Sequence, residues 1–237
     1  MKRDIQAFVL LLLGVVTLRI TWSDLFLNYV KEPMRPLLLA AGFLLTVLGI
    51  WCLAKVIRKP EPVGGHSDHG HDHSQAPTVA WLLLLPVAAI FLIAPPPLGA
   101  DAAARDSGTQ GLAESQDNSY PPLPAGQDPV PLNLDDYAVR ALFDEGRTLD
   151  DRVVRVQGFV TTGESGEWYL TRFLASCCAA DASAIKVRVE DAAAPPVEQW
   201  VEITGTYLPS EGQGYGALAV IRAESVVTID QPRDTYL

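Results

Sequence analysis

Long apolar segments dominate the first hundred residues of the chain. Apolar side chains predominate over residues 5–29, 37–57 and 79–98, and short polar loops separate these runs. The first run is imperfect, because Arg19 and Asp24 lie inside it or near its far end. About 20 apolar residues are enough to cross the hydrocarbon core of a bilayer. Each run therefore predicts a membrane helix, and residues 1–99 together predict a membrane domain of three helices.

The pattern changes after residue 132, where apolar and polar residues begin to alternate. A short helix is expected near residues 135–143, followed by strands over residues 153–160, 168–174, 185–189, 199–208 and 217–229. Gly158 and Gly205 lie inside two of these strands and suit the sharp coiling of a small barrel. Residues 132–237 thus predict a mainly-β domain, an OB-like five-stranded barrel with one short helix. A small β-sandwich is the alternative.

Residues 100–131 separate the two predicted domains. They are rich in Ala, Ser, Gly, Gln, Asp and Pro and offer little to bury. This composition predicts a disordered linker that gives reach between the membrane and the barrel.

Charge separates the chain in the same place. The first hundred residues carry 8 basic and 6 acidic side chains, whereas the remainder carries 10 basic and 22 acidic ones. An acidic domain is a poor partner for nucleic acid, whose phosphates demand Lys and Arg. Basic residues cluster at the N-terminus and after the second apolar run, which predicts a multi-pass cell-membrane protein with a cytoplasmic N-terminus. Three crossings then place the barrel on the external side.

All histidines of the chain lie in the loop over residues 60–77. The candidate ligands there are His66, Asp68, His69, His71, Asp72 and His73. Imidazole and carboxylate groups are ligands that zinc, nickel or copper accept. Nothing fixes ligand geometry in so glycine-rich a loop, so we expect weak, exchangeable binding. A solvated polar loop is the alternative.

Cys177 and Cys178 follow the predicted strand that ends near Leu174. A disulfide between neighbours restrains little chain, so the pair is a poor structural staple. Metal ligation, a vicinal disulfide, a redox thiol and buried small side chains all remain open for it. Asp181 is a candidate third ligand, or the residue that closes an Asx-type turn. Cys52 lies in an apolar run and is expected to be a small buried side chain.

The sequence contains no phosphate-binding glycine loop, no serine–histidine arrangement and no paired-carboxylate signature. We therefore expect a protein that is not an enzyme, with no catalytic residues and no cofactor beyond a metal ion such as zinc or copper.

The run Arg172-Phe173 followed by Cys177-Cys178-Ala179-Ala180-Asp181-Ala182, together with the apolar N-terminal segments and the His-Asp loop, resembles the YcgQ-like family of bacterial membrane proteins. This resemblance implies N-terminal membrane helices, a C-terminal OB-like domain and work beside a separate multi-spanning permease. It implies no substrate and no catalytic residue.

Three functions follow as hypotheses. The first is an accessory subunit of a membrane transporter, a permease partner that handles a transition metal ion. The second is an envelope thiol-redox or stress-sensing protein that uses Cys177 and Cys178. The third is a non-catalytic interaction module whose cysteines are structural.

Overall fold

The computed structural model describes residues 2–58, 96–106, 112, 120–163, 166–210 and 216–237. The chain divides into two compact units. The first comprises Met1–Phe26 and Glu32–Pro96, and the second comprises Leu27–Lys31 and Pro97–Leu237. The short segment Leu27–Lys31, which joins the first two helices in sequence, therefore belongs to the same unit as the C-terminal domain.

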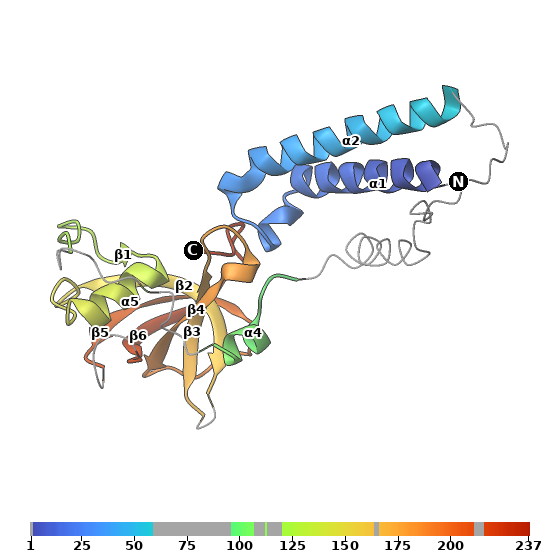
Figure 1. Cartoon of the computed structure of the whole chain (residues 1–237). Coiled ribbons are helices and arrows are strands. Elements are labelled where there is room, and N and C mark those ends of the chain that lie inside the picture. Colours follow the sequence, from blue (N-terminus) through green and yellow to red (C-terminus); the bar gives the residue numbers. More distant parts are fainter. Residues whose placement is uncertain (1, 59–95, 107–111, 113–119, 164–165, 211–215) are drawn as a thin grey trace. The chain divides into compact units, whose positions relative to one another are not determined.

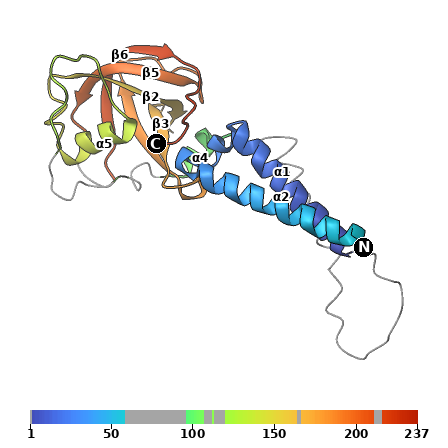
Figure 2. The same ribbon diagram turned by 90° about the horizontal axis from the view of Figure 1, so that it is seen from above.

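Two antiparallel helices form the described part of the first unit (Figures 1 and 2): α1 spans Lys2–Trp22 and α2 spans Arg35–Arg58. Glycines let their backbones approach closely. A Cβ atom on Gly14 would lie 2.6 Å from the backbone nitrogen of Thr46, and one on Gly49 would lie 2.7 Å from that of Leu11. Small residues at the contact allow such packing where the surrounding medium provides no hydrophobic drive between helices.

Among the described residues, one helix is long and apolar enough to span a membrane, the one over Glu32–Arg58. The apolar part of α1, Gln6–Trp22, is shorter. Large apolar side chains such as Phe43, Ile50 and Trp51 are exposed on α2, and an apolar surface of this kind needs lipid or protein to cover it. The structure thus supports one of the three predicted membrane helices. The expected third segment, residues 79–98, falls almost entirely outside the described residues.

The second unit contains a closed β-barrel. Its strands are β2 (Val153–Thr162), β3 (Trp168–Leu174), β4 (Ser183–Glu190), β5 (Trp200–Leu208) and β6 (Ala219–Thr228). The pairing order is β2-β3-β4-β6-β5, and a β2–β5 ladder closes the ring. Only β4 and β6 pair in parallel within this ring. Closure confirms the predicted OB-like barrel and excludes the sandwich, which would leave two separate sheets.

Alternation along the strands sends one set of side chains into the barrel. The largest fully buried ones include Leu170, Ile185, Ile203 and Ile221. Gly205 is essential to the geometry, because a Cβ atom there would lie 2.1 Å from the backbone oxygen of Arg222. The β5–β6 ladder also shifts register between Thr204 and Gly205. The predicted coiling role of this glycine is therefore confirmed.

Helix α5, Leu134–Phe143, packs on the barrel through one apolar face. Leu134, Tyr137, Ala138, Ala141 and Leu142 are buried, a spacing that places them on one side of a helix. The buried Tyr137 hydroxyl donates a hydrogen bond to the backbone oxygen of Val220, at 2.6 Å. Sequence predicted this helix to within one residue at its start.

The segment predicted as a linker, residues 100–131, carries structure of its own. Helix α4, Ala100–Ala104, buries Ala103 against a cluster that includes Phe159, Phe173 and Trp200. Further on, Arg152 donates hydrogen bonds to the backbone oxygens of Pro124 and Gln127. Strand β1, Val130–Pro131, then pairs in parallel with β2. The described parts of this segment therefore pack on the barrel, where the sequence predicted a disordered linker.

Candidate functional site

The cysteine pair lies in the connection between β3 and β4. Strand β3 ends at Leu174, a short 3-10 helix covers Ala179–Asp181, and β4 begins at Ser183. The prediction that the cysteines follow a strand ending near Leu174 is confirmed. We call residues 175–182 the cysteine loop.

The Asp181 carboxylate organises the cysteine loop. Its Oδ1 accepts the backbone N–H of Ser176 at 2.8 Å, and its Oδ2 accepts the backbone N–H of Cys177 at 3.0 Å. The Cys177 thiol donates to the same Oδ2, also at 3.0 Å. Asp181 therefore has the turn-closing role predicted as one of its alternatives, and its Oδ2 also holds the Cys177 thiol.

The same contacts bring three ligand-type atoms together. The two Sγ atoms and a carboxylate oxygen of Cys177, Cys178 and Asp181 all lie within 4.8 Å of one another. Both cysteines are free thiols, Cys177 exposed and Cys178 half-buried. Thiolate sulfur with one carboxylate oxygen is a donor set that zinc accepts, and thiolates also suit Cu(I). The residues present fit such an ion, with one coordination position left for a further ligand.

Hydrogen bonding favours the protonated form of the Cys177 thiol. The hydrogen bond to Asp181, then that to Cys178, raises the pKa of the Cys177 thiol to about 12. The thiol and backbone donors around Asp181 lower the pKa of its carboxyl. Because the thiolate is the nucleophile in thiol chemistry, a raised pKa keeps the reactive fraction of Cys177 low near neutral pH. A bound cation would instead favour the deprotonated sulfur.

A segment far away in sequence supports the cysteine loop. Val30 forms an antiparallel bridge with Cys178, the Lys31 N–H donates to the Cys177 oxygen at 3.1 Å, and the Ala179 N–H donates to the Tyr29 oxygen at 2.7 Å. These bonds add to the Asp181 carboxylate bonds in holding the backbone of the loop. Nothing in the sequence indicated this support, since a backbone contact between residues so far apart in the chain leaves no local pattern.

Lys31 adds a second tie through its side chain. Its Nζ donates to the backbone oxygen of Ala175 at 3.2 Å and to the oxygen of Leu237 at 2.9 Å. The cysteine loop, the end of β3 and the last residue of the chain are thereby held together within the second unit.

The predicted ligands of the other loop, His66, Asp68, His69, His71, Asp72 and His73, lie outside the described residues. Their metal binding stays a prediction.

The fold and site define a protein with an OB-like barrel, a Cys-Cys-Asp loop and at least one N-terminal helix apolar enough to span a membrane. The chain belongs to the DUF1980 family: the DUF1980 N-terminal domain matches residues 5–108, and the DUF1980 C-terminal domain matches residues 114–237. No curated protein and no solved structure matches the chain.

Proposed function

We propose that the C-terminal barrel binds a zinc or copper ion through Cys177, Cys178 and Asp181, and that the protein acts as a metal-handling accessory subunit of a membrane permease. The observation that carries the metal proposal is the convergence of these three ligand atoms within 4.8 Å of one another on an ordered loop. Adjacent thiols alone would be weak support, because neighbouring side chains on a strand point to opposite faces.

The surroundings of the loop favour exchange of the ion over permanent burial. Cys177 is exposed, and three protein ligands leave a tetrahedral ion one position short. Structural zinc sites are closed by four protein ligands, whereas sites that must accept another ligand stay open. A protein that passes a metal ion to a partner needs this kind of site.

The position of Leu27–Lys31 supports three membrane crossings. This segment lies in the same unit as the barrel, so in this proposal both occupy one side of a membrane that α2 spans. The apolar run at residues 79–98 is long enough to supply the return crossing that this arrangement needs. The bias of basic residues favours an external barrel.

The evidence for a permease partner is the apolar surface of α2. The exposed side chains Phe43, Leu44 and Trp51 suit contact with another membrane helix as well as with lipid. Affinity capture of the tagged full chain from detergent-solubilised membranes tests this part. Recovery of a multi-spanning transporter supports it, and its absence after mild cross-linking counts against it.

The metal proposal is tested by zinc titration of the purified full chain against a chromophoric chelator. Three variants separate the two predicted sites: Cys177→Ser with Cys178→Ser, a variant with all four histidines changed to Asn, and Cys52→Ser as the matched cysteine control. Tight zinc binding should disappear only in the double cysteine variant. Equal zinc affinity in the double cysteine variant and the unchanged protein would refute the assignment.

The second candidate function is thiol-redox sensing, which the free and exposed Cys177 thiol favours. Its raised pKa opposes this role, because a redox sensor needs a thiolate. Mass spectrometry of the intact protein from oxidant-treated cells distinguishes the two functions. A Cys177–Cys178 disulfide that forms and reverses would support sensing, and thiols that stay reduced would favour metal handling.

A further inference from the structure

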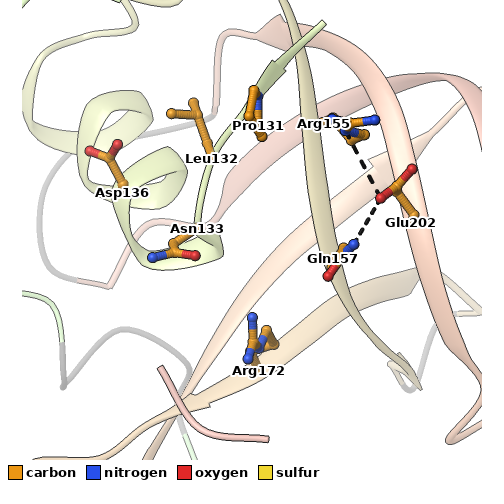
Figure 3. Close-up of a pocket in the computed structure, with 8 residues that line it drawn as sticks. All are labelled: Pro131, Leu132, Asn133, Asp136, Arg155, Gln157, Arg172 and Glu202. Carbon is orange, nitrogen blue, oxygen red and sulfur yellow. Dashed lines mark hydrogen bonds and ion pairs between the residues drawn. The ribbon is translucent and has the colours of Figure 1, made fainter. Parts of the chain in front are cut away.

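A polar pocket of about 540 Å³ lies on the barrel in addition to the cysteine loop. It is formed by β1, the start of α5, β2, β3 and β5, and Figure 3 shows the side chains that face it. Pockets that hold small molecules have volumes of roughly 300 to 1,000 Å³. The residues that line it are Pro131, Leu132, Asn133, Asp136, Arg155, Gln157, Arg172 and Glu202.

Arg172 lines this pocket from β3, and Figure 3 draws it below Asn133 and Gln157. Only 8% of the residue is exposed. Its one hydrogen bond to the described residues runs from Nη2 to the backbone oxygen of Asp234, at 2.5 Å, and its buried Nε has no partner there. A guanidinium has several N–H donors in a planar fork, so most of its N–H groups have no partner among the described residues.

Arg172 also has no carboxylate within ion-pair distance among the described residues. Its guanidinium carbon lies 5.7 Å from the centre of the Trp200 ring, a weak cation–π contact. Burial lowers the pKa of Arg172, and the more distant carboxylates of Asp135 and Asp234 act against this shift. A buried charge without a paired counter-ion is costly, so the site favours an incoming anion.

The acidic side chains in the pocket are already engaged. Asp136 accepts a hydrogen bond from Arg140 at 2.9 Å, and Glu202 accepts one from Gln157 at 2.8 Å, with Arg155 at 4.0 Å (Figure 3). Neither carboxylate forms an ion pair with Arg172, whose charge is offset only in part by the carboxylates of Asp135 and Asp234. Each carboxylate still has lone pairs for a hydroxyl or ammonium donor of a ligand.

The N-terminus of α5 reinforces the preference for an anion. Asn133 is the N-cap residue, and its side chain makes no capping hydrogen bond. The first N–H groups of a helix are unsatisfied by the helix itself and carry a partial positive charge. The amide of Asn133 therefore remains available to a ligand at the same end of the pocket as Arg172.

The geometry points to a binding site for a small carboxylate that also carries an ammonium or hydroxyl group, an amino acid or hydroxy acid, with its carboxylate on Arg172 and Asn133 and its second group toward Asp136 or Glu202. A planar carboxylate matches the guanidinium fork in two hydrogen bonds. A doubly charged phosphate would meet repulsion from Asp136 and Glu202. This site is separate from the proposed metal site, and neither proposal depends on the other.

Titration calorimetry of the full chain in detergent tests the assignment. The probes are L-alanine and L-lactate, with ethanolamine as the probe that lacks a carboxylate and inorganic phosphate as the other oxyanion. We expect heat from at least one carboxylate and none from ethanolamine. Absence of binding by both carboxylates, or tighter binding of phosphate, overturns the carboxylate assignment.

Two variants locate the binding. Arg172→Gln should weaken binding at least about tenfold, since a charge-assisted hydrogen bond is lost. Asn133→Asp adds a negative charge at a position where Asp caps a helix as well as Asn does, so the fold is retained while anion binding falls. The control Arg222→Gln removes an exposed arginine on β6 that pairs with Asp191. Unchanged affinity in both pocket variants refutes the site, and if Arg172→Gln is unstable, unchanged affinity in Asn133→Asp alone refutes it.

Discussion

The cysteine loop and the Arg172 pocket are opposite kinds of site on one barrel. In the loop, Cys177 and Asp181 are exposed, lie close in sequence and satisfy one another through short hydrogen bonds. In the pocket, Arg172 is buried, its neighbours come from distant strands, and its guanidinium makes a single hydrogen bond to the described residues. The loop offers thiols that lose their protons when a cation binds, whereas the pocket offers the positive charge of Arg172, which an anion would neutralise.

Both sites depend on closure of the barrel, so the largest effect should follow from breaking it. Gly205→Val places a side chain where even a Cβ atom would lie 2.1 Å from the Arg222 oxygen. We expect a loss of about 3 kcal/mol in the free energy of unfolding, together with loss of both binding activities. Thermal melting followed by near-UV circular dichroism measures it. Val227→Ala, at an exposed position on β6, serves as the control, and equal melting of the two variants would contradict the close approach.

The independence of the two sites predicts a reciprocal pattern. Arg172→Gln should weaken carboxylate binding at least about tenfold and leave zinc affinity within about twofold. The variant with Cys177→Ser and Cys178→Ser should do the reverse. Parallel titrations of both variants with zinc and L-alanine check this. A loss of both ligands in either variant would show that the sites are coupled through β3 and the loop that follows it.

The rate of alkylation distinguishes Cys177, whose pKa is raised, from an activated thiol, whose pKa is lowered. With a pKa of about 12, Cys177 should be alkylated slowly at pH 7, at a rate that rises about tenfold per pH unit. Asp181→Asn removes the nearby negative charge and replaces one carboxylate oxygen with an NH2 donor, so the pKa of Cys177 should fall and alkylation at pH 7 should accelerate. Site-resolved mass spectrometry after iodoacetamide pulses measures both rates. Faster alkylation in the unchanged protein than in Asp181→Asn would contradict the hydrogen bond.

The smallest effect is expected at Lys31, whose side chain supports the cysteine loop. Lys31→Met removes the donors to the Ala175 and Leu237 oxygens and keeps the aliphatic length of the side chain. Hydrogen exchange at residues 175–179 should accelerate roughly fivefold, in line with the loss of two hydrogen bonds that contribute about 0.5 kcal/mol each. Lys55→Met on α2 is the matched control. Exchange that does not change would mean that backbone bonds alone hold the loop.

The same contrast explains what the sequence could predict. Alternation with period two identified all five barrel strands. Helix α5 was also recognisable from a local pattern, a short apolar stretch with acidic residues at its start. The cysteine loop was recognisable because its ligands lie within five consecutive residues. Barrel closure through β2 and β5 agreed with the strand count but was not specified by any one residue pair.

Features built from distant residues escaped prediction. The pocket joins Asn133, Arg172 and Glu202, which no spacing relates. Leu27–Lys31 was assigned to the end of the first apolar run and the following polar loop, and nothing in it indicated a partner beside Cys178. The linker prediction followed polar composition, although Ala100–Ala104 is rich in the strongest helix-forming residue. The alanine content of this stretch was the signal from which helix α4 could have been predicted.

X-ray absorption spectroscopy can show directly whether the cysteine loop binds zinc. The sample is the zinc-loaded full chain, in the variant with all four loop histidines changed to Asn. We expect a sulfur shell at about 2.3 Å together with a lighter oxygen shell, and loss of the sulfur shell after Cys177→Ser with Cys178→Ser. A spectrum with oxygen and nitrogen neighbours alone would show that the cysteine loop is not a zinc site.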